Sequence, residues 1–135
     1  MPLPDGCEGL RTFLPTKDLA VSREFYAALG FEKLLDAEVA IFAIGSGGAG
    51  IILHYPVASG ATDNLMMQLM VDDLDAWWAH IQSLDLAARF GVRPPTAPAM
   101  QPWGLRLAYL VDPAGVLWHV AERRPEKPQD GPRGG

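Results

Sequence analysis

The side chains best suited to chemistry stand near the ends of strand-like stretches. His54 follows the apolar run GIIL, and His119 lies within the run VLWHV. An imidazole can bind a metal, transfer a proton or hydrogen-bond a ligand, but a histidine on a strand can equally be a structural residue near solvent. Trp103 stands in the loop QPWG, where its indole either anchors the loop or stacks on a planar ligand.

Other kinds of chemistry find little support in the sequence. The single cysteine, Cys7, lies in the leading segment, and no serine stands in a Gly-x-Ser-x-Gly turn, so covalent nucleophilic catalysis is not indicated. The run SGGAG lacks the lysine and the following helix of a phosphate-binding loop. The net charge is −5, without a basic cluster before the extreme C-terminal stretch, which argues against nucleic acid as a partner.

Composition predicts a cytoplasmic globular protein. The 135 residues are 49% hydrophobic and 20% charged, enough for one domain with a buried core. No apolar run approaches the roughly 18 to 20 residues that span a bilayer, and no secretory signal is recognisable, so we expect no membrane association. A lone cysteine suits a reducing compartment. Residues 124–135, rich in proline, glycine and charge, are predicted to form a disordered tail.

The first half of the chain predicts a strand, a helix and three further strands. Leu10–Thr16 is a short apolar strand candidate. Asp18 can cap a helix whose apolar residues recur at helical spacing, and Gly30 suits its C-terminal end. A Gly-Ser-Gly-Gly turn at positions 45–48 separates the last two of three strand candidates, which are Phe31–Asp36, Val39–Ile44 and Gly50–Tyr55.

The second half repeats this order. Leu65–Val71 is a strand candidate, Asp72 or Asp73 can cap the next helix, and Trp77 on that helix is expected in the core. A proline-rich loop and the turn Asp-Pro-Ala-Gly separate three later strand candidates, which are Ala87–Val92, Leu105–Val111 and Val116–Glu122. The repeat predicts an α+β fold with two βαβββ modules, about residues 10–56 and 64–123, within a single domain over residues 1–123.

Three stretches, TKDLAVSREFYAALGF, VDDLDAWWAHI and LVDPAGVLWHVAE, resemble the vicinal oxygen chelate superfamily of glyoxalase I, ring-cleaving dioxygenases and bleomycin-resistance proteins. The resemblance covers nearly all of Leu10–Arg123 and implies curved sheets that pair into a concave cup. The motifs most similar to the bleomycin-resistance branch are Thr62–Asn64, Ala97–Met100, Gln101–Gly104, Asp112–Gly115 and His119–Glu122.

Enzymes of this superfamily carry metal ligands on the first, fifth and eighth strands, and some also on the fourth. The matching positions here are Arg11, Met66, His119 and His54. Arginine is always protonated and cannot be a ligand, and a thioether suits hard-metal oxygen chemistry poorly. The resemblance therefore implies a protein that uses no metal and no other cofactor.

The resemblance implies a non-catalytic binding protein that sequesters a planar, antibiotic-like and cationic small molecule, as in antibiotic resistance. The short connection between the modules resembles that of relatives whose modules pair across chains, so we expect a homodimer. The expected ligand-binding residues are Trp103, His54, His119, Gln68, Met66 and Phe42, with Asp36 and Glu38 at the rim to attract a cation. A metal-dependent lyase or dioxygenase is the alternative, and an oligomeric binding module of another role is a third possibility.

Overall fold

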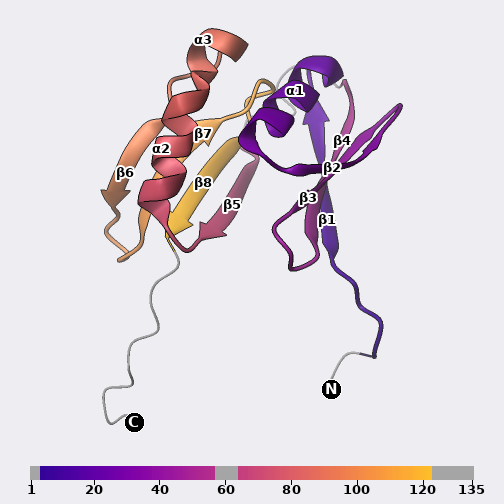
Figure 1. The fold of residues 1–135 in the computed structure, drawn as a ribbon, viewed down its shortest axis with the longest axis horizontal. Coiled ribbons are helices and arrows are strands. Elements are labelled where there is room, and N and C mark those ends of the chain that lie inside the picture. Colours follow the sequence, from indigo (N-terminus) through magenta and orange to yellow (C-terminus); the bar gives the residue numbers. More distant parts are fainter. Residues whose placement is uncertain (1–3, 57–63, 123–135) are drawn as a thin grey trace.

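The computed structural model describes residues 4–56 and 64–122, which form two modules side by side (Figure 1). The first module contains β1 (Leu10–Thr16), α1 (Leu19–Leu29), β2 (Glu32–Asp36), β3 (Ala40–Ile44) and β4 (Ala49–Pro56). The second contains β5 (Met66–Val71), α2 (Leu74–Leu84), α3 (Leu86–Phe90), β6 (Thr96–Met100), β7 (Arg106–Val111) and β8 (Leu117–Glu122). The predicted α+β class is confirmed, and the predicted tail at 124–135 lies outside the described residues.

Both sheets have the same topology, as an internal repeat requires. The strand orders are β1-β4-β3-β2 and β5-β8-β7-β6, so two four-stranded sheets correspond strand by strand. The pairs β1 with β4 and β5 with β8 are parallel, and the remaining pairs are antiparallel. In each sheet the first strand of the module lies at an edge. Figure 1 shows β5 at the edge of its sheet nearer the first module.

Helix α1 begins and ends where its sequence predicts. The Asp18 carboxylate accepts hydrogen bonds from the backbone N–H groups of Ala20 and Val21, which satisfies two free donors of the first turn. Gly30 has a φ of 103°, a left-handed conformation that glycine adopts without steric cost. One face of the helix is buried in the core, through Ser22, Phe25, Tyr26 and Leu29.

A buried polar contact joins the two modules. The hydroxyl of Tyr26, on α1, donates to Oδ2 of Asp112 at 2.6 Å and accepts from Nε1 of Trp118 at 2.9 Å. The other Asp112 oxygen accepts from the N–H groups of Ala114 and Val116, at 2.8 and 2.9 Å, and so closes the turn between β7 and β8. One hydrophobic cluster surrounds this contact and contains residues of both modules.

Burial dominates the electrostatics of the contact. It raises the pKa of the Asp112 carboxyl, although the hydrogen bonds from Tyr26 and the backbone oppose the shift. Burial also raises the pKa of the Tyr26 hydroxyl, and the neighbouring Asp112 raises it further. Tyr26 therefore stays a neutral donor to the buried Asp112 carboxyl group.

Two predicted elements of the second module are wrong. The segment expected as the strand Ala87–Val92 is the short helix α3, because Asp85 turns the chain at φ 53° and the following alanines favour helix. The proline-rich segment expected as a loop contains β6, which includes Pro98. That strand is the outer edge of its sheet, with a register shift between Thr96 and Ala99, and an edge strand tolerates a residue without an N–H.

Within residues 4–56 and 64–122, every helix is too short or too polar to cross a membrane.

Replacing Tyr26 with phenylalanine should destabilise the fold by about 1–3 kcal/mol, because the buried Asp112 and the Trp118 indole both lose a hydrogen-bond partner. Urea unfolding at neutral pH measures this loss. Tyr109→Phe is the matched control, since Tyr109 lies half-buried on the other side of its sheet. Equal losses of unfolding free energy in the two variants would show that the Tyr26 hydroxyl stabilises the fold no more than the half-buried Tyr109 hydroxyl does.

Candidate ligand-binding site

The two faces of the second sheet differ in burial along β5 and at His119. On β8, Trp118 and Val120 are buried in the core, whereas His119 points to the other side. We call this other side the open face of the second sheet. The β5 residues on it are well exposed, with 57% of Met66 and 48% of Met70 accessible. Exposed thioethers on a sheet face are unusual in a core-forming strand and mark a surface available for contact.

A row of polar side chains crosses the open face. Thr96 pairs with Tyr109, Tyr109 with His119, and His119 with Gln68, so one residue from each of β6, β7, β8 and β5 stands at the same level. The His119 ring lies edge-on to the Tyr109 ring, with 4.9 Å between centroids. The row places hydroxyl, imidazole and amide groups in line on an otherwise apolar surface.

A hollow of about 410 Å³ lies on this face. Its polar lining comes from three members of the row together with an arginine of the loop before β6. The lining residues are Met66, Arg93, Pro94, Thr96, Tyr109, Leu110, Val111, Leu117 and His119. The volume falls within the roughly 300–1,000 Å³ of small-molecule sites, and the mixture of apolar walls with a few polar groups is typical of such sites.

The first sheet also has an open face. Phe13 on β1 is 61% exposed, and its ring meets the His54 ring edge-on, with 6.0 Å between centroids. The carbonyl oxygen of His54 accepts a hydrogen bond from Thr16 Oγ1 at 2.8 Å, which fixes the backbone there. Phe13, Ile52 and Ile41 are register partners across three strands, so this face is an apolar stripe.

Glycine makes room for Arg11 on the first open face. Arg11 pairs with Gly50 on the neighbouring strand. A Cβ atom at Gly50 would lie 2.7 Å from the carbonyl oxygen of Phe42 and 3.3 Å from Cγ of Arg11. The absence of a side chain therefore lets the Arg11 stem lie close to the sheet.

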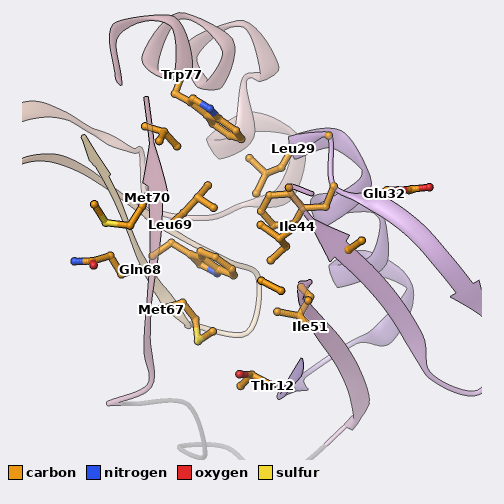
Figure 2. A pocket seen from close by; sticks show the side chains of 18 of the residues that line it. Thr12, Leu29, Glu32, Ile44, Ile51, Met67, Gln68, Leu69, Met70 and Trp77 are labelled. Carbon is orange, nitrogen blue, oxygen red and sulfur yellow. The ribbon is translucent and has the colours of Figure 1, made fainter. Parts of the chain in front are cut away.

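A second hollow, the inter-module groove, opens between the two modules and has a volume of about 820 Å³. Figure 2 shows Leu69, Leu29 and Ile44 directed toward its centre, whereas Gln68 and Met70 point to the other side of β5. Trp77, expected in the core, is only half-buried and lines the groove. Because Ile51 and Trp118 in its wall also belong to the core cluster, the groove is an open extension of the core.

The structure brings together only some of the predicted ligand-binding residues. Met66, Gln68 and His119 share the open face of the second sheet, and His54 lies on that of the first. Trp103 is 61% exposed in the turn between β6 and β7, where Gly104 N donates to Gln101 O at 2.9 Å, and it lines neither hollow.

Phe42, expected as a ligand contact, does not line an open face of either sheet. Its side chain is fully buried and lies near the Tyr26 ring, with 6.2 Å between centroids. Phe42 pairs with Ile51 on the core side of the sheet, whereas its neighbour Ile41 pairs with Ile52 on the open side. The run AIFAI is apolar throughout, so the sequence does not show which of its alternating side chains face the core.

The two acidic rim residues differ in their surroundings. Asp36 forms ion pairs with Lys33 at 2.9 Å and with Arg23 at 3.0 Å. The Lys33 hydrogen bond and the Arg23 charge lower the pKa of Asp36, so this carboxylate is already compensated by two cations. Glu38 is exposed in the connection between β2 and β3, in the other module from the hollow on the second sheet. Neither residue lines that hollow.

Sequence reasoning missed Arg93 and Tyr109 as lining residues. The position of Tyr109 could be predicted from the hairpin register, because strand alternation then places it on the same face as His119 of the neighbouring strand. Arg93 lies in a segment predicted as loop, where no periodicity indicates direction. Among the described residues, no group of three or more His, Cys, Asp or Glu side chains lies close enough to hold a metal.

The family model of the glyoxalase/bleomycin resistance protein/dioxygenase superfamily matches residues 10–120. The chain belongs to this superfamily. Its fold is similar to that of a bleomycin-binding protein solved in complex with bleomycin, at 26% identity and a TM-score of 0.70, over 85% of this chain and 98% of that one. No curated protein matches the chain.

Two further solved structures of similar fold differ in their activity. A bleomycin resistance determinant encoded on the transposon Tn5 is 26% identical, with a TM-score of 0.66, over 85% of this chain and 97% of that one. A lactoylglutathione lyase from Agrobacterium tumefaciens is 22% identical, with a TM-score of 0.65, over 89% and 95%. Solved structures of similar fold thus include both a bleomycin-binding protein and a lactoylglutathione lyase.

Gly50→Ala should destabilise the protein by about 1–3 kcal/mol, because the new Cβ meets the backbone of β3 and displaces Arg11. Thermal or urea unfolding measures the effect. Gly47→Ala is the matched control, since a Cβ at Gly47 meets nothing within 4 Å. A Gly50 variant as stable as the Gly47 variant would contradict the close packing of β1 and β3 around Gly50 of β4.

Proposed function

We propose that this protein binds a planar aromatic small molecule on the open faces of its sheets, without catalysing a reaction. The observation that carries the proposal is the open face of the second sheet, where Met66, Tyr109 and His119 line a hollow and the exposed Gln68 is the register partner of His119. The similarity to a bleomycin-binding protein at 26% identity supports a binding role of the same type.

The chemistry of this face suits a flat ring system. Methionine side chains adapt to irregular apolar ligands, and the Tyr109 and His119 rings offer a stacking or edge-on partner. Gln68 and Thr96 at the two ends of the polar row can fix orientation through hydrogen bonds. We assign the ligand to this face rather than to the inter-module groove, because the groove extends the core.

A second copy of the chain completes the site in this proposal. Both open faces carry exposed apolar side chains, and β1 and β5 are sheet edges whose outer backbone groups lack a strand partner among the described residues. Unpaired edges and exposed apolar faces favour association. In a two-fold dimer, the first sheet of one chain can face the second sheet of the other, giving two equal pockets. In such a dimer, His54 and Trp103 can contact the same ligand.

The superfamily's metal positions support a metal-free site. Arg11 and Met66 occupy two of the four positions at which enzymes of the superfamily carry ligands, and Arg11 lies flat against the sheet at Gly50. Two imidazoles without a carboxylate form an incomplete ligand set.

The alternative is a metal-dependent lyase or dioxygenase, and His54 and His119 favour it because each lies on an open face. Elemental analysis separates the two functions. About one Zn, Fe, Mn or Ni per chain, lost when both histidines are replaced, would favour the enzyme.

Trp103→Ala should weaken binding of a planar ligand by about 1–3 kcal/mol, which is roughly 5- to 150-fold in Kd, while the fold stays intact. The indole is exposed and therefore available to stack. Titration of tryptophan fluorescence with bleomycin-type and other planar heteroaromatic compounds measures the Kd.

Met100→Ala provides the control, because Met100 is 64% exposed at the start of the same turn and lacks a ring. Unchanged affinity in the Trp103 variant would remove Trp103 from the site. Absence of binding by every planar compound would reject the proposed function itself.

The protein should be a homodimer by light scattering at micromolar concentration, and Phe13→Asp should shift it toward the monomer. Phe13 lies on the edge strand β1, where a buried charge at an interface is costly. Leu34→Asp, at the opposite edge of the same sheet, should leave the dimer intact. A monomeric parent protein would refute this assembly.

A further inference from the structure

We propose that the ligand of the second-sheet hollow carries an anionic group, such as a carboxylate, and that the Arg93 guanidinium binds it. The inference rests on the proposed function and names its ligand class. It departs from the expectation of a cationic ligand, which depended on acidic residues at the rim.

The polar lining of the hollow consists of groups that can donate hydrogen bonds. Arg93 offers five fixed donors, Thr96 and Tyr109 offer hydroxyls, and His119 offers a ring nitrogen in either neutral tautomer. No Asp or Glu lines this hollow. A cationic group placed there would meet a guanidinium without a compensating carboxylate, whereas an anionic group would meet only donors.

Arg93, like Arg11 and Arg89, has no carboxylate partner among the described residues, in contrast to Arg23 and Arg106. Arg23 pairs with Asp36 at 3.0 Å, and Arg106 pairs with Glu122 at 3.0 Å and with Asp75 at 3.2 Å. Arg93 forms no ion pair with any carboxylate within residues 4–56 and 64–122. On a protein with a net charge of −5, an uncompensated guanidinium at a hollow is a local positive site.

The sheet places the Arg93 guanidinium beside one end of the polar row. Arg93 precedes Thr96 by three residues, and Thr96 begins the polar row that continues through Tyr109 and His119. A ligand whose ring lies against Tyr109 and His119 can therefore direct an acidic substituent toward Arg93 and the Thr96 hydroxyl. The planar guanidinium fork matches the two oxygens of a carboxylate.

Three probes of one ring system test the charge preference: naphthoate, its neutral analogue naphthamide, and cationic naphthylmethylammonium. Calorimetric titration of the full-length protein should show naphthoate binding about tenfold more tightly than naphthamide, because charge-assisted hydrogen bonds exceed neutral ones. Arg93→Gln should remove this preference, because it weakens the binding of naphthoate about tenfold more than that of naphthamide. Lys17→Gln makes the same change in net charge in the other module and should keep the preference.

Each other result overturns the inference. Naphthamide or naphthylmethylammonium binding as tightly as naphthoate would reject an anionic ligand while leaving the proposed aromatic binding site in place. Equal weakening of naphthoate and naphthamide in the Arg93 variant would make Arg93 an apolar contact. Failure of all three probes to bind at millimolar concentration would reject the proposed function, and this inference with it.

Discussion

The contact of Tyr26 with Asp112 and Trp118 is the interaction on which the arrangement of the two modules depends. Its three side chains come from α1, the turn after β7 and β8, and all are buried. Buried polar groups must keep their partners, so the contact permits few relative orientations of the modules. With α1 held against the second module, the helix-side faces of both sheets form one core, and the opposite faces carry the exposed side chains of Phe13, Met66 and Met70.

Strand alternation then decides which chemistry reaches the surface. Residues of β5 and β8 alternate between the core and the open face, so Trp118 packs beside Tyr26 while His119 stands on the other side. A shift of the register by one residue would bury the polar row and expose the core. The Asp112 turn prevents this shift, because it fixes the hairpin that joins β7 to β8. The Asp112 carboxyl group therefore joins the two modules and also fixes the register that pairs Tyr109 with His119.

Features with a local physical signature could be predicted from the sequence, and features that depend on register could not. The caps at Asp18 and Gly30 and the duplicated strand order follow from residue types at fixed spacing. Phe42 was misplaced because both of its neighbours are apolar, so only the pairing with Ile51 reveals that it faces inward. The strand β6 was missed because it contains a proline, which an edge position tolerates. Arg93 lies in a loop, and only the tertiary structure brings it to the hollow.

The local charge around the hollow is a second property that depends on tertiary structure and cannot be predicted from the sequence. In the sequence, Asp36 and Glu38 indicate a negative rim, and the net charge of −5 agrees with it. In the structure, Arg23 and Lys33 compensate Asp36, while Arg93 stands without a carboxylate partner among the described residues. The potential at a small hollow depends on the charges within a few ångströms, because more distant exposed charges are screened over roughly 8–10 Å. An acidic protein can therefore present a locally positive binding surface, and the local ion pairs decide the charge of the ligand that fits it.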